Sequence, residues 1–125
     1  MLIKIKPLPG PTKDDVNAER SRRIIAGTTI NIHDYGPVAL QGRDEDKANL
    51  QGLAFGASMR IAGGDLETTT IFRDANNVDH FLKPPQIVEM WSLGSEWISA
   101  VFQASWSLKE FDPIPSNFAD DSFWP

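Results

Sequence analysis

The chain has no cysteine and only two histidines among its 125 residues. The lack of cysteine excludes disulfides, zinc sites with thiolate ligands and thiolate catalysis. His33 beside Asp34 and His80 beside Asp79 are the only pairs with acid–base or metal-ligand character. A site built from them needs two turns to converge and a third ligand or a positioned water. We therefore expect these histidines to be surface turn residues.

Basic residues are also in the minority, with 12 Lys and Arg against 17 Asp and Glu and a net charge of −5. The only basic cluster, Arg20, Arg22 and Arg23, is too small to neutralise a row of phosphates, so we expect no nucleic-acid partner. We interpret the cluster as a solvated helix face on which Glu19 pairs with Arg22 or Arg23.

Long apolar runs are absent, and the alternating start of the chain is too short for a signal peptide. We expect a soluble protein that is made in the cytoplasm, without its own secretion signal and without a membrane partner.

Sequence motifs of common enzyme classes are missing as well. The chain has no Gly-x-Ser-x-Gly elbow and no phosphate-binding Gly-Lys-Ser/Thr loop. Glu89, Glu96 and Glu110 are isolated acids without histidines at metal-binding spacing. We therefore predict no catalytic residue, no metal and no cofactor, and a protein that is not an enzyme.

The most prominent feature that is present is a strongly apolar stretch from Pro85 to about Lys109. Its apolar residues recur at helical spacing but spread well beyond one narrow stripe. Trp91, Trp97 and Trp106 lie in it, and each can bury roughly 150–250 Å². We predict a helix that is wrapped by the rest of the domain, by copies of itself, or by both.

The remaining pattern predicts a single α+β domain over residues 14–110, in the order helix, β-hairpin, helix, β-hairpin, helix. The expected elements are a helix over 14–26, strands over 28–32 and 37–40, a helix from 44 that ends at Gly63, and strands over 67–73 and 78–82. Gly52 and Gly56 lie one turn apart in the second helix and each costs about 1 kcal/mol relative to alanine. We expect them to allow close packing against the tryptophan-rich helix.

Both ends of the chain suggest docking segments. Residues 1–13 contain an alternating strand with Leu2, Ile3 and Ile5, which either closes the domain's own sheet or adds to the sheet edge of a neighbour. Residues 111–125 are rich in proline and carry Phe118, Phe123 and Trp124, which are costly to expose. We expect an extended tail that lies on the chain's own surface or on that of a partner.

The run from Asn17 to Ile30, NAERSRRIIAGTTI, resembles the opening of an uncharacterised domain family found in tail and tail-fibre proteins of tailed phages and prophages. Ala48 to Gly52 and the turn Asp74 to Asn77 resemble, more loosely, later parts of that family, so the resemblance spans about residues 16–109. The last helix departs from the family in its aromatic content. The family offers no catalytic residues to carry over, and the resemblance implies a place in a phage virion near the tail.

These observations favour a structural protein of a phage tail, baseplate or fibre, located in the virion tail and bound to other tail or fibre proteins. Because fibres are commonly trimeric, a homotrimer is the first expectation. One alternative is a tail-fibre assembly chaperone that is absent from finished particles. Another is a carbohydrate-binding or hydrolytic tip that acts on the host surface through a groove of tryptophan and acidic side chains.

Overall fold

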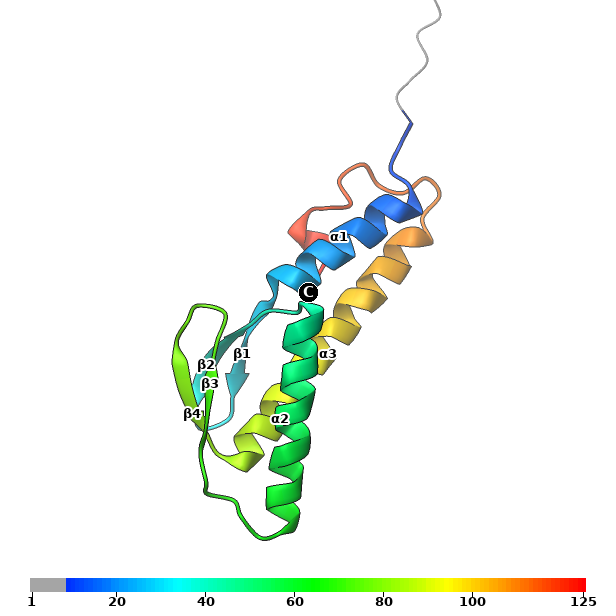
Figure 1. Ribbon diagram of the computed structural model, residues 1–125. Helices are drawn as coiled ribbons and strands as arrows, with labels where there is room; N and C mark the ends of the chain where they lie inside the picture. Colours follow the sequence, from blue (N-terminus) through cyan, green and yellow to red (C-terminus); the bar gives the residue numbers. More distant parts are fainter. Residues whose placement is uncertain (1–8) are drawn as a thin grey trace, which may run out of the picture.

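The computed structural model describes residues 9–125, and the predicted strand with Leu2, Ile3 and Ile5 lies outside these residues. The elements are α1 (Lys13–Ala26), β1 (Thr28–Ile32), β2 (Gly36–Leu40), α2 (Asp44–Ala62), β3 (Thr70–Arg73), β4 (Asp79–Leu82), α3 (Pro84–Lys109) and the 3₁₀ turn η1 (Asp121–Phe123). The expected α+β fold and its element order are confirmed. Figure 1 shows α3 as the long axis, with α1 beside one half, α2 beside the other and the hairpins next to α2.

Two hydrophobic clusters divide the length of α3. Ile87 and Met90, near its beginning, are packed with the hairpins and α2. Val101 and Leu108, near its end, are packed with α1 and the C-terminal segment. The spread of apolar residues around α3 is therefore explained by different elements covering it at its two ends.

The first helix begins and ends at clear sequence signals. The Thr12 hydroxyl accepts a hydrogen bond from the Asp15 N–H at 3.2 Å, and the Asp15 carboxylate accepts one from the Thr12 N–H at 2.8 Å. At the other end Gly27 has a φ of 83°, and a Cβ there would lie 1.7 Å from the Leu40 carbonyl oxygen. Glycine at this position lets α1 end directly against the last residue of β2.

The four strands form two separate antiparallel hairpins, β1–β2 and β3–β4. Ile30 pairs with Val38 in the first hairpin, and Ile71 pairs with Phe81 in the second. The Ala75 N–H of the second turn donates to the Ala39 carbonyl of β2 at 3.0 Å, which ties the hairpins together. The second hairpin is shorter than expected, because β3 begins at Thr70 and Asp65 holds the preceding residues in a turn through the Glu67 and Thr68 N–H groups.

The expected role of Gly52 and Gly56 is wrong. Among residues 9–125, no heavy atom outside their own helix turn lies within 4 Å of a Cβ built at either glycine. The glycine at the helix contact is instead Gly94 of α3, where a Cβ would lie 3.3 Å from Leu40 Cδ1 and 3.7 Å from Leu50 Cδ2. Gly52 and Gly56 thus lie on the outer side of α2.

Candidate functional site

The three tryptophans of α3 differ in their surroundings. Trp97 is half-buried and packs against the cluster at the α1 end of the helix. Trp91 and Trp106 are 41% and 52% exposed. The domain therefore covers this helix only in part, and two large aromatic side chains face outward.

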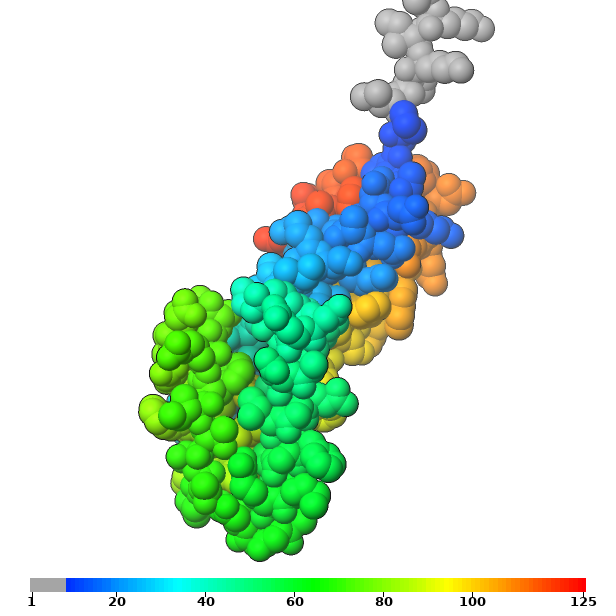
Figure 2. Space-filling view, viewed as in Figure 1, coloured from blue at the N-terminus to red at the C-terminus, as the bar shows by residue number. Residues whose placement is uncertain are grey.

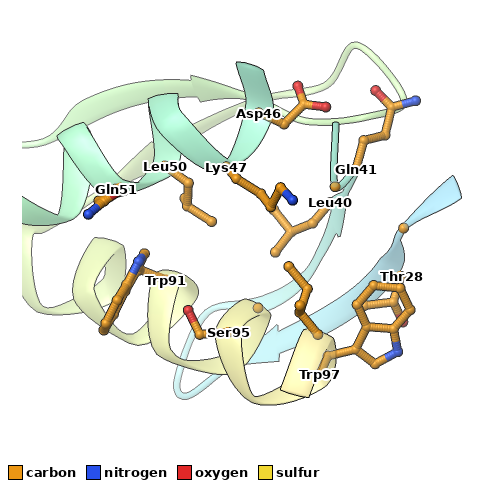
Figure 3. A pocket seen from close by; sticks show the side chains of 14 residues that line it. Thr28, Leu40, Gln41, Asp46, Lys47, Leu50, Gln51, Trp91, Ser95 and Trp97 are labelled. Atoms are coloured by element: carbon orange, nitrogen blue, oxygen red, sulfur yellow. The ribbon is translucent and has the colours of Figure 1, made fainter. Parts of the chain in front are cut away.

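A pocket of about 300 Å³ lies between α2, α3 and the ends of β1 and β2. Trp91 and Trp97 stand at its two ends, with Leu40 and Leu50 between them (Figure 3). Its polar lining includes Gln41, Asp46, Lys47, Gln51 and Ser95. The pocket is mainly apolar with polar groups at its rim, which is the general character of small binding sites in proteins.

The C-terminal segment folds onto its own chain. Trp124 is 7% exposed and joins the same hydrophobic cluster as Val16 and Leu108, while Phe118 and Phe123 are half-buried against it. The Trp124 indole N–H donates to the Phe118 carbonyl at 2.8 Å. Of the two surfaces expected for this tail, its own is the one observed. The tail is also not fully extended, because it contains turns and η1.

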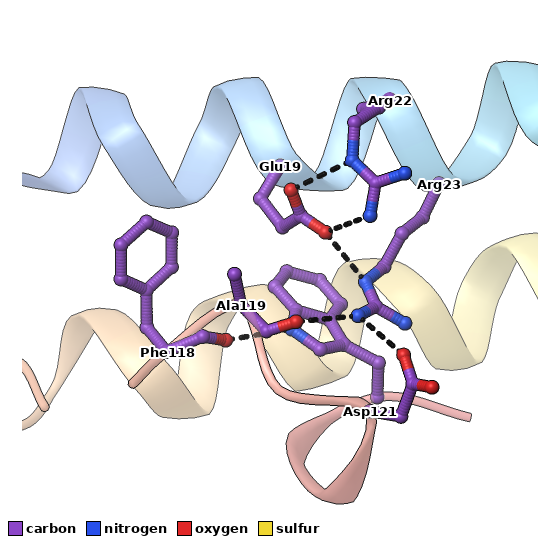
Figure 4. Close-up of polar contacts among 7 residues, drawn as sticks. Glu19, Arg22, Arg23, Phe118, Ala119 and Asp121 are labelled. Atoms are coloured by element: carbon purple, nitrogen blue, oxygen red, sulfur yellow. Dashed lines mark hydrogen bonds and ion pairs between the residues drawn. The ribbon is translucent and has the colours of Figure 1, made fainter. Parts of the chain in front are cut away.

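Arg23 connects this segment to α1. Its guanidinium donates to the Ala119 carbonyl at 2.7 Å, to Asp121 at 2.9 Å and to Glu19 at 2.9 Å (Figure 4). The hydrogen bond from Arg22, together with that from Arg23, holds the pKa of the Glu19 carboxyl below its ordinary value, although burial opposes the shift. These groups form an ion-pair network that fixes the tail.

The arginine cluster is thus only partly a solvated face. Glu19 pairs with both Arg22 and Arg23, where the sequence predicts a pair with one or the other. Arg23, however, is largely covered, and the Arg20 guanidinium lies 4.4 Å from the centre of the Phe102 ring and donates to the Ser105 hydroxyl at 3.1 Å. Residue spacing does not predict these contacts, because their partners lie roughly 80 to 100 residues further along the chain.

The prediction of surface turn residues holds for one histidine and fails for the other. His33 and Asp34 are exposed turn residues, as predicted. His80 is buried, which contradicts the prediction, and its partner is Asp74, not Asp79. Its Nε2 lies 2.7 Å from the Asp74 carboxylate and its Nδ1 lies 2.7 Å from the Tyr35 hydroxyl.

The Asp74 carboxylate is hydrogen-bonded to three groups. Burial raises its pKa, but the hydrogen bonds from His80, Val78 and Asn76 outweigh this effect, and the pKa of Asp74 lies below its ordinary value. The hydrogen-bonded series Asp74, His80 and Tyr35 resembles a proton relay. It connects the β3–β4 hairpin, which holds Asp74 and His80, to the turn between β1 and β2, which holds Tyr35. None of these three residues lines the pocket between Trp91 and Trp97.

Exposed apolar side chains also occur on α2 and the second hairpin. Phe55 and Met59 of α2 are 70% and 60% exposed, and the paired Ile71 and Phe81 of β3 and β4 are also exposed. Figure 2 shows α2 and this hairpin side by side on one face of the molecule. A shallow groove between them is lined by Ala48, Asn49, Gly52, Leu53, Ile71, Phe72 and Arg73. The sequence does not predict this area, because the spacing of Gly52 and Gly56 suggests helix packing instead.

The described part of the chain contains no group of three or more His, Asp or Glu side chains placed to hold a metal ion. Glu96 and Glu110 are exposed, and Glu89 accepts the His33 N–H at 3.1 Å. Within residues 9–125, no helix has the length and apolarity needed to cross a bilayer.

Residues 9–117 match the family model of the domain of unknown function DUF4376. The chain belongs to this family. The DUF4376 match includes every helix from α1 to α3 and both hairpins, while Phe118, Phe123 and Trp124 follow it. No curated protein and no solved structure matches the chain. The family is one of unknown function, so membership shows a shared domain and indicates no activity or partner.

Proposed function

We propose that this DUF4376 chain is a structural, non-enzymatic protein of a tailed phage. It is a small tail, baseplate or fibre-associated subunit that sits in the virion tail, binds neighbouring tail or fibre proteins and forms a homo-oligomer. The phage setting rests on the resemblance of residues 17–30 to domains of phage tail and tail-fibre proteins.

The observation that carries the assembly role is the apolar area on α2 and the second hairpin. Isolated exposed apolar side chains are ordinary, but several that gather over neighbouring elements mark an interaction surface. Phe55 and Met59 lie one helical turn apart on α2, and Ile71 and Phe81 are a cross-strand pair of the second hairpin. A shallow groove lined by Gly52 and Ile71 lies between the two elements. The C-terminal segment (residues 111–125) is a weaker candidate for docking, since Trp124 is buried against its own domain.

The test combines two measurements. Light scattering gives the mass of the purified protein in solution, and mass spectrometry of purified particles from the same source shows whether it is a virion component. A subunit role predicts a stable oligomer that is also found in particles in fixed copy number. A protein that is produced during infection but absent from particles overturns the structural role and supports the assembly chaperone.

The pocket between α2 and α3 favours one other role, a carbohydrate-binding tip. Trp91 at the pocket's end remains exposed, and the side-chain amides of Gln41 and Gln51 line the same pocket as hydrogen-bonding groups. The Asp46 carboxylate, also in the lining, is already bound by Arg43. A sugar ring stacks on an aromatic face and bonds to amides and carboxylates. This role predicts that purified host polysaccharide quenches tryptophan fluorescence, and that Trp91→Ala removes the effect while Trp106→Ala keeps it.

A further inference from the structure

A hollow of about 350 Å³ lies between α1, the start of α2 and α3. Its lining includes Arg20 and Ile24 of α1, Lys47 of α2 and Phe102 of α3. Gly42 and Lys47 line both this hollow and the pocket between Trp91 and Trp97. The two cavities are therefore neighbouring parts of one depression, called here the α1–α2 groove.

The floor of the α1–α2 groove is one stripe of α3. Trp91, Ile98 and Phe102 line it and are separated by seven and four residues, which places them on the same face of the helix. Trp91 is exposed, and the other two are half-buried. At a rise of about 1.5 Å per residue the stripe is about 16 Å long, which matches roughly five residues of an extended chain.

Arg20 lies beside this stripe as a half-buried cation without an acidic partner. Within residues 9–125 its guanidinium forms no ion pair with an Asp or Glu side chain. Its contacts are the Ser105 hydroxyl at 3.1 Å and the Phe102 ring, whose centre is 4.4 Å away. A guanidinium has five N–H donors and Ser105 takes one of them, so Arg20 can still bind both oxygens of a carboxylate.

Ser105 holds this guanidinium in place. It is fully buried, and its hydroxyl donates to the Phe102 carbonyl at 2.7 Å while it accepts from Arg20. The cation is thus fixed between a buried hydroxyl and an aromatic ring before any ligand arrives. A positioned side chain loses less conformational freedom on binding than a mobile one.

The charges that line the hollow are opposite in sign to the charge of the chain. The chain has a net charge of −5, but the hollow is lined by Arg20, Arg43 and Lys47 and by one acid, Asp44. Arg43 is paired with Asp46. Asp44 is fully exposed and lies 3.3 Å from Lys47. The lining therefore keeps an excess of positive charge, which favours an acidic ligand.

The chain itself contains an example of the contact that Arg20 lacks. Arg23, about one turn further along α1, binds the Asp121 carboxylate at 2.9 Å and also contacts the ring of Trp124. An α1 arginine there binds a carboxylate and an aromatic side chain that belong to one segment. At Arg20 the aromatic ring is supplied by α3, and the place of the carboxylate is open to a partner.

We propose that the α1–α2 groove binds an acidic and apolar segment of a partner protein, which places a carboxylate on Arg20 and an apolar side chain against the α3 stripe. This inference rests on the proposed assembly role and specifies the chemistry of the neighbouring subunit. The two fail separately, because particle composition tests the role and binding to the isolated chain tests the groove.

The probes are phenylacetate, which joins a carboxylate to an aromatic ring, its neutral amide phenylacetamide, and acetate, which lacks the ring. NMR spectra of the isotope-labelled full chain follow the Nε–H of Arg20 and the ring of Phe102 during each titration. Phenylacetate is expected to bind with a dissociation constant of about 1 mM, as suits a ligand of its size. The amide and acetate are each expected to bind at least about tenfold more weakly.

Two matched variants test the role of the guanidinium. Arg20→Gln removes the charge and is expected to weaken phenylacetate binding at least about tenfold, with little change for phenylacetamide. Arg22→Gln removes an exposed arginine of the same helix, one that is paired with Glu19, and is expected to leave both dissociation constants unchanged. Circular dichroism verifies that each variant folds, and the comparison of the three probes on the parent chain needs no variant.

The proposal is overturned if phenylacetamide or acetate binds as tightly as phenylacetate, or if Arg20→Gln binds phenylacetate as the parent does. It is also overturned if no signal moves up to about 20 mM phenylacetate. Glucuronate is the last probe. If it binds more tightly than phenylacetate, the groove takes an acidic sugar and the protein partner is wrong.

Discussion

The guanidinium carbon of Arg23 lies 5.2 Å from the centre of the Trp124 ring, so a side chain of α1 lies over the penultimate residue of the chain. The same guanidinium also bonds to Ala119 and Asp121. A cation above an indole ring is attracted by its π electrons, and the contact gains strength where water is excluded. The C-terminal segment is therefore part of the domain's core.

Removal of the last eight residues should destabilise the monomer. Trp124→Ala alone should lower the free energy of unfolding by about 3 kcal/mol, because it empties a buried aromatic site. Urea unfolding followed by circular dichroism measures the loss. The control is Trp106→Ala, which changes an exposed tryptophan and should cost less than about 1 kcal/mol. Equal unfolding midpoints for the full and shortened chains would contradict this account of the tail.

The Glu19 network predicts a loss of stability in acid. The pKa of Glu19 is lower in the folded chain than in the unfolded chain, so the unfolded state takes up the proton first as pH falls. Its contribution is complete above its ordinary pKa of about 4.3 and disappears as pH falls through the lower folded value. Glu19→Gln should be less stable by about 1–3 kcal/mol near neutral pH. The gap to the parent should close in acid, whereas a gap that is constant with pH would show that the charge is not responsible.

The sequence was sufficient for local structure and insufficient for long-range contacts. Thr12, Asp15 and Gly27 act within one or two turns of the backbone, so the bounds of α1 could be read from them. The pairing of His80 with Tyr35 and that of Arg23 with Asp121 depend on how hairpins and tail pack, which residue spacing does not encode.

The candidate surface illustrates the same limit. The sequence indicates that Gly52 and Gly56 destabilise α2 and therefore require a compensating close contact, and it predicts the apolar helix α3 as the partner. Helical periodicity gives the relative directions of these residues but not which side of α2 is covered. The open space around a Cβ built at Gly52 or Gly56, together with the contact of Gly94 with Leu40 and Leu50, shows that the two glycines of α2 face away from α3.

The hydrogen bond between Tyr35 and His80 should stabilise the contact between the hairpins. Tyr35→Phe leaves the Nδ1 of buried His80 without this partner. The expected loss is about 1 kcal/mol, because Tyr35 is 39% exposed and water can take the place of its hydroxyl. Urea unfolding measures it. His33→Ala changes an exposed histidine of the same turn and is expected to stay within about 0.5 kcal/mol of the parent. If both variants unfold alike, the Tyr35 hydroxyl contributes nothing to the junction.

Two glycine substitutions of the same kind should have opposite effects on the monomer. Gly52→Ala adds a methyl group to open space on a helix and should raise the free energy of unfolding by about 1 kcal/mol. Gly27→Ala places a methyl group at a φ of 83° and against the Leu40 carbonyl, and should lower it by about 2 kcal/mol or more.

Both glycine variants are compared by urea unfolding at a concentration where the chain is monomeric, so that self-association does not contribute. A loss of monomer stability in Gly52→Ala would mean that this glycine is already in a close contact within one chain. A gain that is accompanied by weaker self-association would mean that the glycine is retained at a cost to the helix because a second copy packs there.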